Sequence, residues 1–293
     1  MEGLPLFVAT RPLLTFAIAA ATVVCAAVLA WWILRRVRGP LWNVLAFTWP
    51  RAVGLLPALS RLRTPAAWQG GTLVLDLLLG FGIVLLAVGV FFEVADEIDL
   101  DEGLGRFDLA VSTELARSAS PETLQTFAAI THLGDAATQW AIGVVVALFL
   151  VVRRKRLLTI AWIAAVAGNG VLNRVLKAIF ERDRPLHEHG FAEVHGWSFP
   201  SGHTAGSVAV YGMLAYLLCR AAPPLWRLPI ALSGLAIALL VGYSRVVLQV
   251  HYVSDVLAAF LTAGAWLIVC IGAAHVVGVH YAHRASAGIA ADR

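Results

Sequence analysis

Charged side chains are scarce in this chain, since Asp, Glu, Lys and Arg together make up 14% of its 293 residues. A soluble globular domain usually carries about 25% of such residues, so this composition excludes an ordinary soluble protein. With 60% hydrophobic residues and a mean hydropathy of +0.80, the chain has the composition of a polytopic membrane protein. The formal net charge is only +4. We expect the excess Lys and Arg in cytoplasmic loops rather than on a surface that binds nucleic acid.

Cysteine is scarce too. The three residues Cys25, Cys219 and Cys270 all lie within apolar runs. They have neither the spacing of a metal site nor the number typical of a disulfide framework, so we interpret them as small apolar side chains. The chain also has no low-complexity segment and no internal repeat.

Long apolar runs, in contrast, are abundant. About twenty apolar residues cross a bilayer as a helix, which predicts spans at 13–34, 72–92, 137–152, 157–179, 203–220, 228–248 and 253–277. A cluster of basic residues follows the first run, which is of full length, and this favours a retained span over a cleaved signal peptide. The segment 40–63 is apolar but broken by Pro50, Arg51 and Pro57. We expect it to be interfacial or re-entrant, with an additional span as the alternative.

The predicted fold is therefore all-α: a polytopic transmembrane helical bundle with a six-span core and one extra N-terminal span. We expect an N-terminal helix and interfacial segment at 1–70, the core at 71–280 and a cytoplasmic tail at 281–293. The loop at about 93–136 has apolar residues at helical spacing. This spacing fits a short amphipathic helix on the outer membrane surface, or an ordinary connecting helix.

The uneven distribution of charge orients the predicted bundle. Arg35, Arg36 and Arg38 lie on the same side as the basic run 153–156, and the positive-inside rule makes that side cytoplasmic. The acidic residues between 93 and 108 fall on the opposite side, together with three ionisable clusters further along the chain. The sequence thus predicts an integral protein of the bacterial inner membrane with an outer, periplasmic site, or a lumenal site in a eukaryote.

Ionisable residues are costly in a membrane chain, and by default they mark a functional site. In the first cluster Lys177 ends a span, and six residues separate it from Arg184-Pro185. Arg binds phosphate as a planar fork and Lys binds it as a point charge, although Lys177 also fits an anchor at the membrane interface. The neighbouring Arg182 and Asp183 are interpreted as solvated loop charges outside the site.

The second cluster, Pro200-Ser201-Gly202-His203, immediately precedes an apolar run. Ser201 is a candidate N-cap whose hydroxyl also donates to an anion, and Gly202 lets the backbone approach a ligand closely. The free N–H groups of a helix N-terminus suit phosphate, and His203 in the first turn is placed to protonate a leaving oxygen. The alternative is simple helix capping beside a solvated histidine.

The third cluster contains Ser244-Arg245, five further residues, His251, three further residues and Asp255. The i, i+4 spacing of His251 and Asp255 places both side chains on one helical face. A carboxylate bonded to one imidazole nitrogen leaves the other nitrogen free to attack, and Arg245 adds a phosphate fork. The alternative is a His–Asp pair that only secures the start of a helix.

The three clusters, in this order, resemble the motif of the type 2 phosphatidic acid phosphatase and vanadium haloperoxidase superfamily. The match has no departures over about 80 residues, and it favours the integral-membrane lipid phosphatase branch. The resemblance implies that His251 attacks phosphorus to form a phosphohistidine, that Asp255 orients it, and that His203 protonates the leaving group and then activates water. The residues implied to bind the phosphoryl oxygens are Lys177, Arg184, Ser201, Gly202 and Arg245. No metal or other cofactor is expected.

The leading interpretation is a lipid phosphatase that removes a phosphomonoester or a diphosphate from a membrane lipid. Candidate substrates are undecaprenyl diphosphate, phosphatidylglycerophosphate, phosphatidate and phosphorylated lipid A. The alternatives are a lipid transporter or scramblase, a non-catalytic membrane scaffold, and a vanadate-dependent haloperoxidase, against which the many spans argue. His187, His189 and His195 are interpreted as loop residues near the substrate entrance rather than as metal ligands.

Overall fold

The computed structural model describes residues 65–101, 103–185, 190–192 and 194–291, together with scattered positions between 10 and 40. No strand occurs among these residues. The helices are α3 (Pro65–Asp96), α4 (Gly103–Ser118), α5 (Pro121–Thr131), the 3-10 turn η2 (His132–Gly134), α6 (Ala136–Val152), α7 (Arg156–Phe180), α8 (Gly202–Ala221), α9 (Pro224–Val247) and α10 (Val253–Ala291). The all-α prediction is confirmed.

Six stretches of the described residues are long and apolar enough to cross a membrane: Asp76–Asp96, Pro121–Val152, Arg156–Phe180, Gly202–Ala221, Pro224–Val247 and Val253–Gly278. They confirm the predicted six-span core. The second stretch is longer than the predicted span 137–152, because α5 and η2 lead directly into α6. The extra span at 13–34 and the segment 40–63 lie largely outside the described residues.

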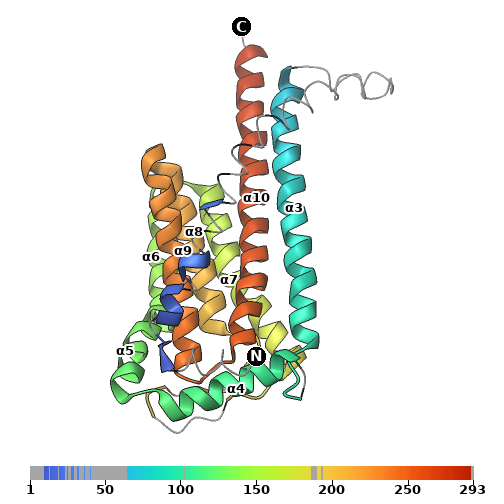
Figure 1. Ribbon diagram of the computed structural model, residues 1–293. Coiled ribbons are helices and arrows are strands. Elements are labelled where there is room, and N and C mark those ends of the chain that lie inside the picture. Colours follow the sequence, from blue (N-terminus) through green and yellow to red (C-terminus); the bar gives the residue numbers. More distant parts are fainter. Residues whose placement is uncertain are drawn as a thin grey trace. The chain divides into compact units, whose positions relative to one another are not determined.

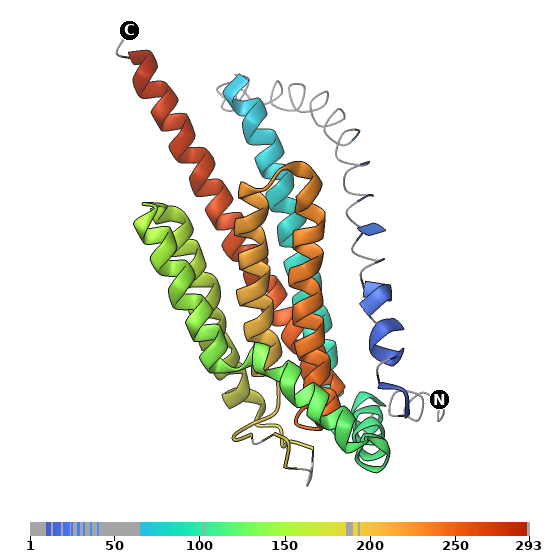
Figure 2. The same ribbon diagram turned by 90° about the vertical axis from the view of Figure 1, so that its left-hand side faces the viewer.

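The chain divides into two compact units, Ala19–Ile83 on the one hand and Met1–Ile18 with Val84–Arg293 on the other. The larger unit contains every residue of the predicted site. Within it, α6 packs beside α7 and α8 packs beside α9, as Figures 1 and 2 show.

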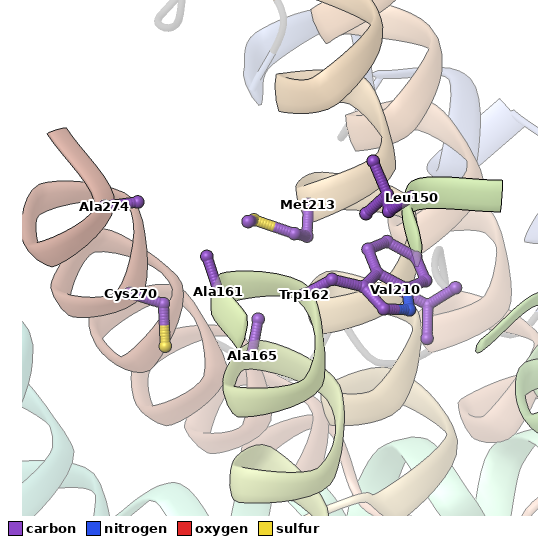
Figure 3. Packing of buried hydrophobic residues seen from close by; sticks show 8 residues of the cluster. All are labelled: Leu150, Ala161, Trp162, Ala165, Val210, Met213, Cys270 and Ala274. Atoms are coloured by element: carbon purple, nitrogen blue, oxygen red, sulfur yellow. The ribbon is translucent and has the colours of Figure 1, made fainter. Parts of the chain in front are cut away.

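Close helix packing in this unit depends on small residues. A Cβ on Gly234 of α9 would lie 2.9 Å from the backbone oxygen of Tyr211 on α8, and one on Gly212 would lie 2.6 Å from Leu267 Cδ2 on α10. Such contacts are typical of membrane helices, whose association relies on van der Waals packing. A cluster of buried residues that includes Trp162, Val210 and Met213 joins α6, α7, α8 and α10, and Figure 3 shows how these side chains lie.

At one end of the bundle, α7 and α9 end and α8 and α10 begin. Figure 1 shows α4 crossing that end, where α9 finishes and α10 begins. On α4, Val111 and Leu115 are buried against Val246 of α9. A helix in the 93–136 loop is thus confirmed, while its location at the membrane surface stays a prediction and an ordinary connecting helix stays the alternative. The α4 face covers the segment that carries the third cluster.

Candidate active site

The third cluster forms a buried imidazole–carboxylate dyad. His251 Nδ1 lies 3.1 Å from Asp255 Oδ2, and both side chains are almost completely buried. His251 precedes α10 by two residues instead of lying within it, and Asp255 reaches back to accept a bond of 2.9 Å from the backbone N–H of Tyr252. This backward reach is the geometry of a capping box. The two residues therefore meet as predicted, although not through a shared helical face.

Burial sets the protonation state of His251. It lowers the pKa of His251 to about 3, because the loss of hydration outweighs the opposing hydrogen bond and charge of Asp255. The imidazole is therefore neutral near neutral pH. Since the ionised carboxylate of Asp255 only accepts, the proton sits on Nδ1 and the lone pair on Nε2. A neutral histidine with a free Nε2 is the form that attacks an electrophile.

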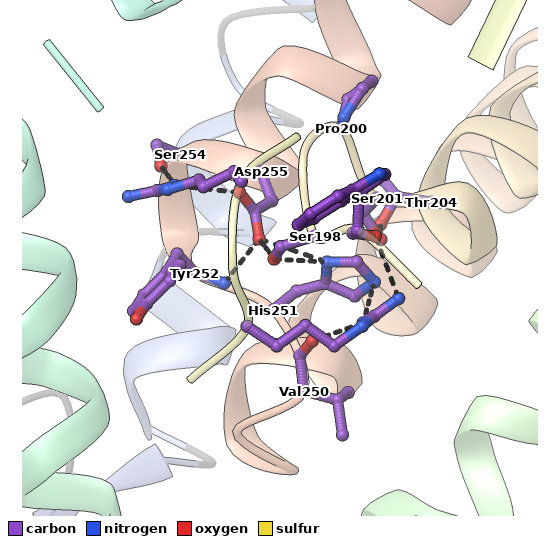
Figure 4. A network of polar contacts seen from close by, with 12 residues as sticks. Ser198, Pro200, Ser201, Thr204, Val250, His251, Tyr252, Ser254 and Asp255 are labelled. Carbon is purple, nitrogen blue, oxygen red and sulfur yellow. Dashed lines mark hydrogen bonds and ion pairs between the residues drawn. The ribbon is translucent and has the colours of Figure 1, made fainter. Parts of the chain in front are cut away.

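A serine from the preceding loop completes the dyad. Ser198 Oγ donates to Asp255 Oδ2 and lies 3.3 Å from His251 Nδ1. Figure 4 shows Ser198, His251 and Asp255 converging on one point. Ser198 is fully buried. It was not among the predicted site residues, although it stands only two residues before the second cluster.

Arg184 lies directly against Nε2 of His251. Its Nη1 is 3.1 Å from His251 Nε2 and donates to the Val250 carbonyl at 2.7 Å, while Nε donates to the Gly196 carbonyl at 2.8 Å. Burial lowers the pKa of Arg184 from its ordinary value, an effect that Asp255 opposes. The guanidinium is thus held by loop carbonyls at the place where an anion attacked by His251 would arrive.

Lys177 is directed into the same loop. Its Nζ donates to the carbonyl of Trp197 and, at 3.1 Å, to that of Ser198. A Cβ added to Gly202 would lie 3.9 Å from Lys177 Cε and 3.3 Å from Asn173 Oδ1. The first and second clusters therefore share one space, and these contacts favour a site residue over an interfacial anchor.

Ser201 occupies the N-cap position of α8 as predicted, but its hydroxyl caps no backbone N–H within the described helix. Instead Ser201 Oγ accepts a bond of 3.0 Å from Thr204 Oγ1. Its backbone N–H donates to the Asp255 carbonyl at 3.0 Å, which ties the start of α8 to α10. The structure thus bears out the N-cap position of Ser201 and contradicts the alternative of simple side-chain capping, because Thr204 takes the place of the backbone donor.

Arg245 is 2% exposed and donates from Nη1 to Thr131 Oγ1 at 2.8 Å. Its Nε has no hydrogen-bond partner in the described part of the chain. A buried donor of a charged group without an acceptor is costly. Arg245 therefore offers an unused donor that an anion would satisfy.

His203 lies in the first turn of α8 and is partly exposed. Its Nε2 is 3.0 Å from Asp135 Oδ1, just before α6. Asp135 could not be identified from the sequence, because 68 residues separate it from His203 and nothing in the local pattern links the two.

Arg182 was wrongly interpreted as a solvated loop charge. It is 9% exposed, and it donates to Asp255 Oδ1 at 2.8 Å, to Ser254 Oγ at 2.7 Å and to Asp108 Oδ2 at 3.1 Å. Its guanidinium also lies 4.2 Å from the centre of the Tyr252 ring. Arg182 therefore holds Oδ1 of the Asp255 carboxylate, whose other oxygen contacts His251. Asp183, in contrast, is exposed.

Asp108 anchors this network from α4. It is buried, and it accepts bonds from the backbone N–H of Ser254 at 3.1 Å and from the Ser254 hydroxyl. Burial raises the pKa of Asp108, although Ser254 and Arg182 oppose the shift. Asp108 lies on the same helical face as the buried Val111 and Leu115. An aspartate on the apolar face of a helix is the sequence pattern that could have identified Asp108.

No group of three or more His, Cys, Asp or Glu side chains suited to a metal ion occurs among the residues that the structure describes. His187 and His189 lie outside these residues. His195 is exposed, and its carbonyl accepts from Arg184 Nη2 at 3.4 Å.

Comparison with known proteins accounts for this arrangement. Residues 158–278 match the family model described as the PAP2 superfamily. The chain is 34% identical over 161 residues to phosphatidylglycerophosphatase B of Bacillus subtilis (strain 168), a match that covers 52% of this chain and 76% of that protein. The chain belongs to the PAP2 superfamily. The predicted relationship to type 2 phosphatidic acid phosphatases is thereby confirmed, and so is the assignment as a phosphatase.

Other PAP2 proteins support the same relationship. The chain is 32% identical over 162 residues to a lipid A 1-phosphatase of Rhizobium johnstonii, covering 47% of this chain and 62% of that protein. It is also similar to the crystal structure of a transmembrane PAP2-type phosphatidylglycerolphosphate phosphatase from Bacillus subtilis. That similarity has a TM-score of 0.59 and 28% sequence identity, and it covers 64% of this chain and 94% of the other. The PAP2 core of this chain is therefore a membrane-spanning one.

Proposed function

We propose that this PAP2 protein hydrolyses a phosphate ester of a membrane lipid through a phosphohistidine on His251. The observation that carries the proposal is the state of this side chain. It is neutral, its Nδ1–H is bonded to Asp255, and its Nε2 lies 3.1 Å from the Arg184 cation. The proposed nucleophile thus has its orienting carboxylate at one ring nitrogen and a phosphate-binding group at the other.

In the first step, Nε2 of His251 attacks phosphorus and the bond from phosphorus to the leaving oxygen breaks. Asp255 stabilises the positive charge that develops on the ring. Arg184, which donates to Nε2 in the resting site, transfers its donors to the phosphoryl oxygens. The unused Nε of Arg245 and the ammonium of Lys177 supply further positive charge. Positioned cations of this kind stabilise a phosphoryl transition state electrostatically.

In the second step, water attacks the phosphohistidine and releases inorganic phosphate. His203 gives its proton to the leaving oxygen in the first step and takes a proton from water in the second. Ser201 and the backbone N–H of Gly202, at the start of α8, complete the expected phosphate cradle.

The proposed substrate class is a lipid that carries a terminal phosphate. The site lies where membrane-length helices begin and end, so a lipid head group reaches it while the acyl chains remain in the bilayer. The names of the two relatives are those of phosphatases acting on phosphatidylglycerophosphate and on the 1-phosphate of lipid A. Phosphatidylglycerophosphate is therefore the first substrate to test, with phosphatidate, a phosphorylated lipid A and undecaprenyl diphosphate beside it.

Purified protein should release inorganic phosphate from at least one of these four lipids, and His251→Ala should release none. With a substrate labelled at the terminal phosphate, the wild-type protein should also carry acid-labile label after a rapid quench. Normal turnover by His251→Ala, or label that survives acid, would refute the mechanism. The exposed substitution Glu122→Gln on α5 serves as a control and should leave turnover unchanged.

We further propose that the site faces the periplasm, as the distribution of basic residues favours. In a variant whose native cysteines Cys25, Cys219 and Cys270 are replaced by alanine, Arg106→Cys on α4 should react with an impermeant thiol reagent in intact cells. Lys155→Cys, in the turn between α6 and α7, should react only after lysis. Both positions are exposed in the structure. The reverse pattern would place the site on the cytoplasmic face.

A further inference from the structure

One carboxylate outside the three clusters contacts two imidazoles. Asp135 Oδ1 lies 3.0 Å from His203 Nε2, and Asp135 Oδ2 lies 2.7 Å from His132 Nδ1. His132 is largely exposed, whereas His203 is mostly covered. Oδ1 of Asp135 thus contacts the histidine to which the proposed mechanism gives the acid–base role.

Helix capping does not explain Asp135. It occupies the N-cap position of α6 in an extended conformation, where an aspartate usually accepts from the backbone N–H two or three residues later. Its side chain makes no such bond within the described helix. Both oxygens are directed at imidazoles instead, so the carboxylate forgoes the stabilisation that a cap usually supplies.

The turn that carries Asp135 is fixed against α8. Tyr211 of α8 donates from its hydroxyl to the Leu133 carbonyl at 2.7 Å. Gln139 of α6 donates from Nε2 to the carbonyls of Gly134 and His203, at 2.9 and 3.3 Å.

A glycine lets this turn reach the histidine. A Cβ on Gly134 would lie 2.5 Å from Val241 Cγ1 and 3.2 Å from His203 Cδ2, so only glycine allows the approach. The turn is therefore built to hold a group beside the ring of His203.

The contact decides which nitrogen of His203 is available. An ionised carboxylate only accepts, so the bond to Asp135 places a proton on Nε2. In neutral His203 the lone pair then sits on Nδ1, and in the cation the second proton sits there. The nitrogen that exchanges a proton with the substrate is therefore Nδ1.

We propose that Asp135 is the positioning residue of the acid–base histidine, as Asp255 is for the nucleophile. The inference rests on the proposed phosphatase function. Asp135 fixes the ring and tautomer of His203 and stabilises its cationic form by charge. It touches neither the phosphate nor the attacking nitrogen.

The proton transfers balance in both steps. When the bond from phosphorus to the leaving oxygen breaks, that oxygen receives the proton of Nδ1 and departs as an alcohol. Neutral His203 then takes a proton from the attacking water at Nδ1, while the bond between phosphorus and His251 Nε2 breaks and a phosphorus–oxygen bond forms. Asp135 keeps its bond to Nε2–H throughout and gains no proton.

The dependence on the leaving group separates this role from a structural one. An alkoxide leaving group of a lipid needs a proton from His203, whereas the phenolate of p-nitrophenyl phosphate departs with little help from an acid. General acid–base catalysis contributes about 100- to 10,000-fold. We therefore expect Asp135→Asn to slow single-turnover release of the lipid alcohol about 10- to 100-fold, and to slow p-nitrophenol release less than about 3-fold.

Matched variants make the test specific. Asp135→Glu should recover part of the lipid rate, because it restores a carboxylate. Adding Asp135→Asn to His203→Ala should cause no further loss, because the carboxylate then has no ring to act through. The exposed His132→Ala should change either rate less than about 3-fold, since His203 keeps its bond to Asp135.

Two results would overturn the assignment of Asp135. One is an equal loss with both substrates in Asp135→Asn, which would indicate a structural role. The other is a full additional loss in the double variant. His251→Ala tests the underlying function in the same experiments: if it still turns over the lipid, the proposed phosphatase mechanism fails and the inference fails with it. If it is inactive with both substrates, the comparison of leaving groups decides the role of Asp135 alone.

Discussion

Replacing Arg182 by methionine tests how the nucleophile is held in place. The guanidinium is the cation between two buried carboxylates, 3.1 Å from Asp108 and 2.8 Å from Asp255. Methionine fills a similar volume without charge or donors. Removing one partner of a buried ion pair costs about 3–5 kcal/mol, because the remaining charge stays desolvated. We expect Arg182→Met to lose stability of this order and to lose turnover, since Asp255 no longer has a fixed outer oxygen.

The loss of stability should depend on pH in a defined direction. Burial raises the pKa of Asp108, and removing the Arg182 cation raises it further. A carboxyl with a higher pKa in the folded than in the unfolded protein binds its proton more tightly when folded. The folded state therefore loses stability as the pH rises through the folded-state pKa. The deficit of Arg182→Met should be largest at alkaline pH and smallest at acid pH, where Asp108 is protonated.

Thermal unfolding of the purified protein in detergent measures this effect. A loss of 3–5 kcal/mol corresponds to roughly 6–20 °C, taking about 2–4 °C per kcal/mol for a chain of this size. Adding Asp108→Asn to Arg182→Met should recover part of the loss, because only one carboxylate then lacks a cation. Arg106→Met, an exposed position on α4, is the matched control. If Arg182→Met unfolds and turns over like the wild type, Arg182 does not hold Asp255.

Three other positions allow direct tests. Burial lowers the pKa of His251 to about 3. NMR of the isotope-labelled imidazole should therefore show no protonation between about pH 8 and pH 5. A titration midpoint near the ordinary pKa of histidine would contradict this prediction. Arg245→Lys keeps the charge but loses the fork and the free Nε, so kcat/KM should fall about 10- to 100-fold in phosphate-release assays; unchanged kinetics would remove Arg245 from the site. Gly134→Ala brings a Cβ to 2.5 Å from Val241 Cγ1 and should destabilise the protein by about 1–3 kcal/mol in thermal unfolding. The control is Gly143→Ala, whose Cβ would lie 4.0 Å from its nearest neighbour and should not destabilise the protein.

The spans and the grouping of the clusters could be predicted from the sequence for one physical reason. A bilayer imposes a length on each apolar run, so the ends of successive runs alternate between two faces. Four residues of the clusters stand at the ends of such runs: Lys177, His203, Arg245 and Asp255. Counting the membrane crossings between them predicts that they lie on one face of the membrane. The spacing of His251 and Asp255 then predicted their contact, which the structure confirms at 3.1 Å.

The partners of these residues could not be predicted in this way. Arg182 meets Asp108 across 74 residues, and His203 meets Asp135 across 68. Both carboxylates lie upstream of the 80-residue segment that carries the motif. Arg182 is buried because α4 covers it. The residue pattern of the loop around Arg182 does not predict this contact. Long-range packing therefore decides which charges near the motif belong to the site.

The position of α4 bears on which part of the chain is needed for activity. The matched family model begins downstream of Arg156, at residue 158, yet Asp108 on α4 accepts from the backbone N–H of Ser254, beside Asp255. A fragment that starts at Arg156 would keep the whole motif and lose the countercharge that secures Arg182. We expect that moving α4 away from the end of the bundle would leave Arg182 without the Asp108 carboxylate and lower activity without any change at His251. A fragment without the segment between the first two core spans should therefore be less active than the full chain.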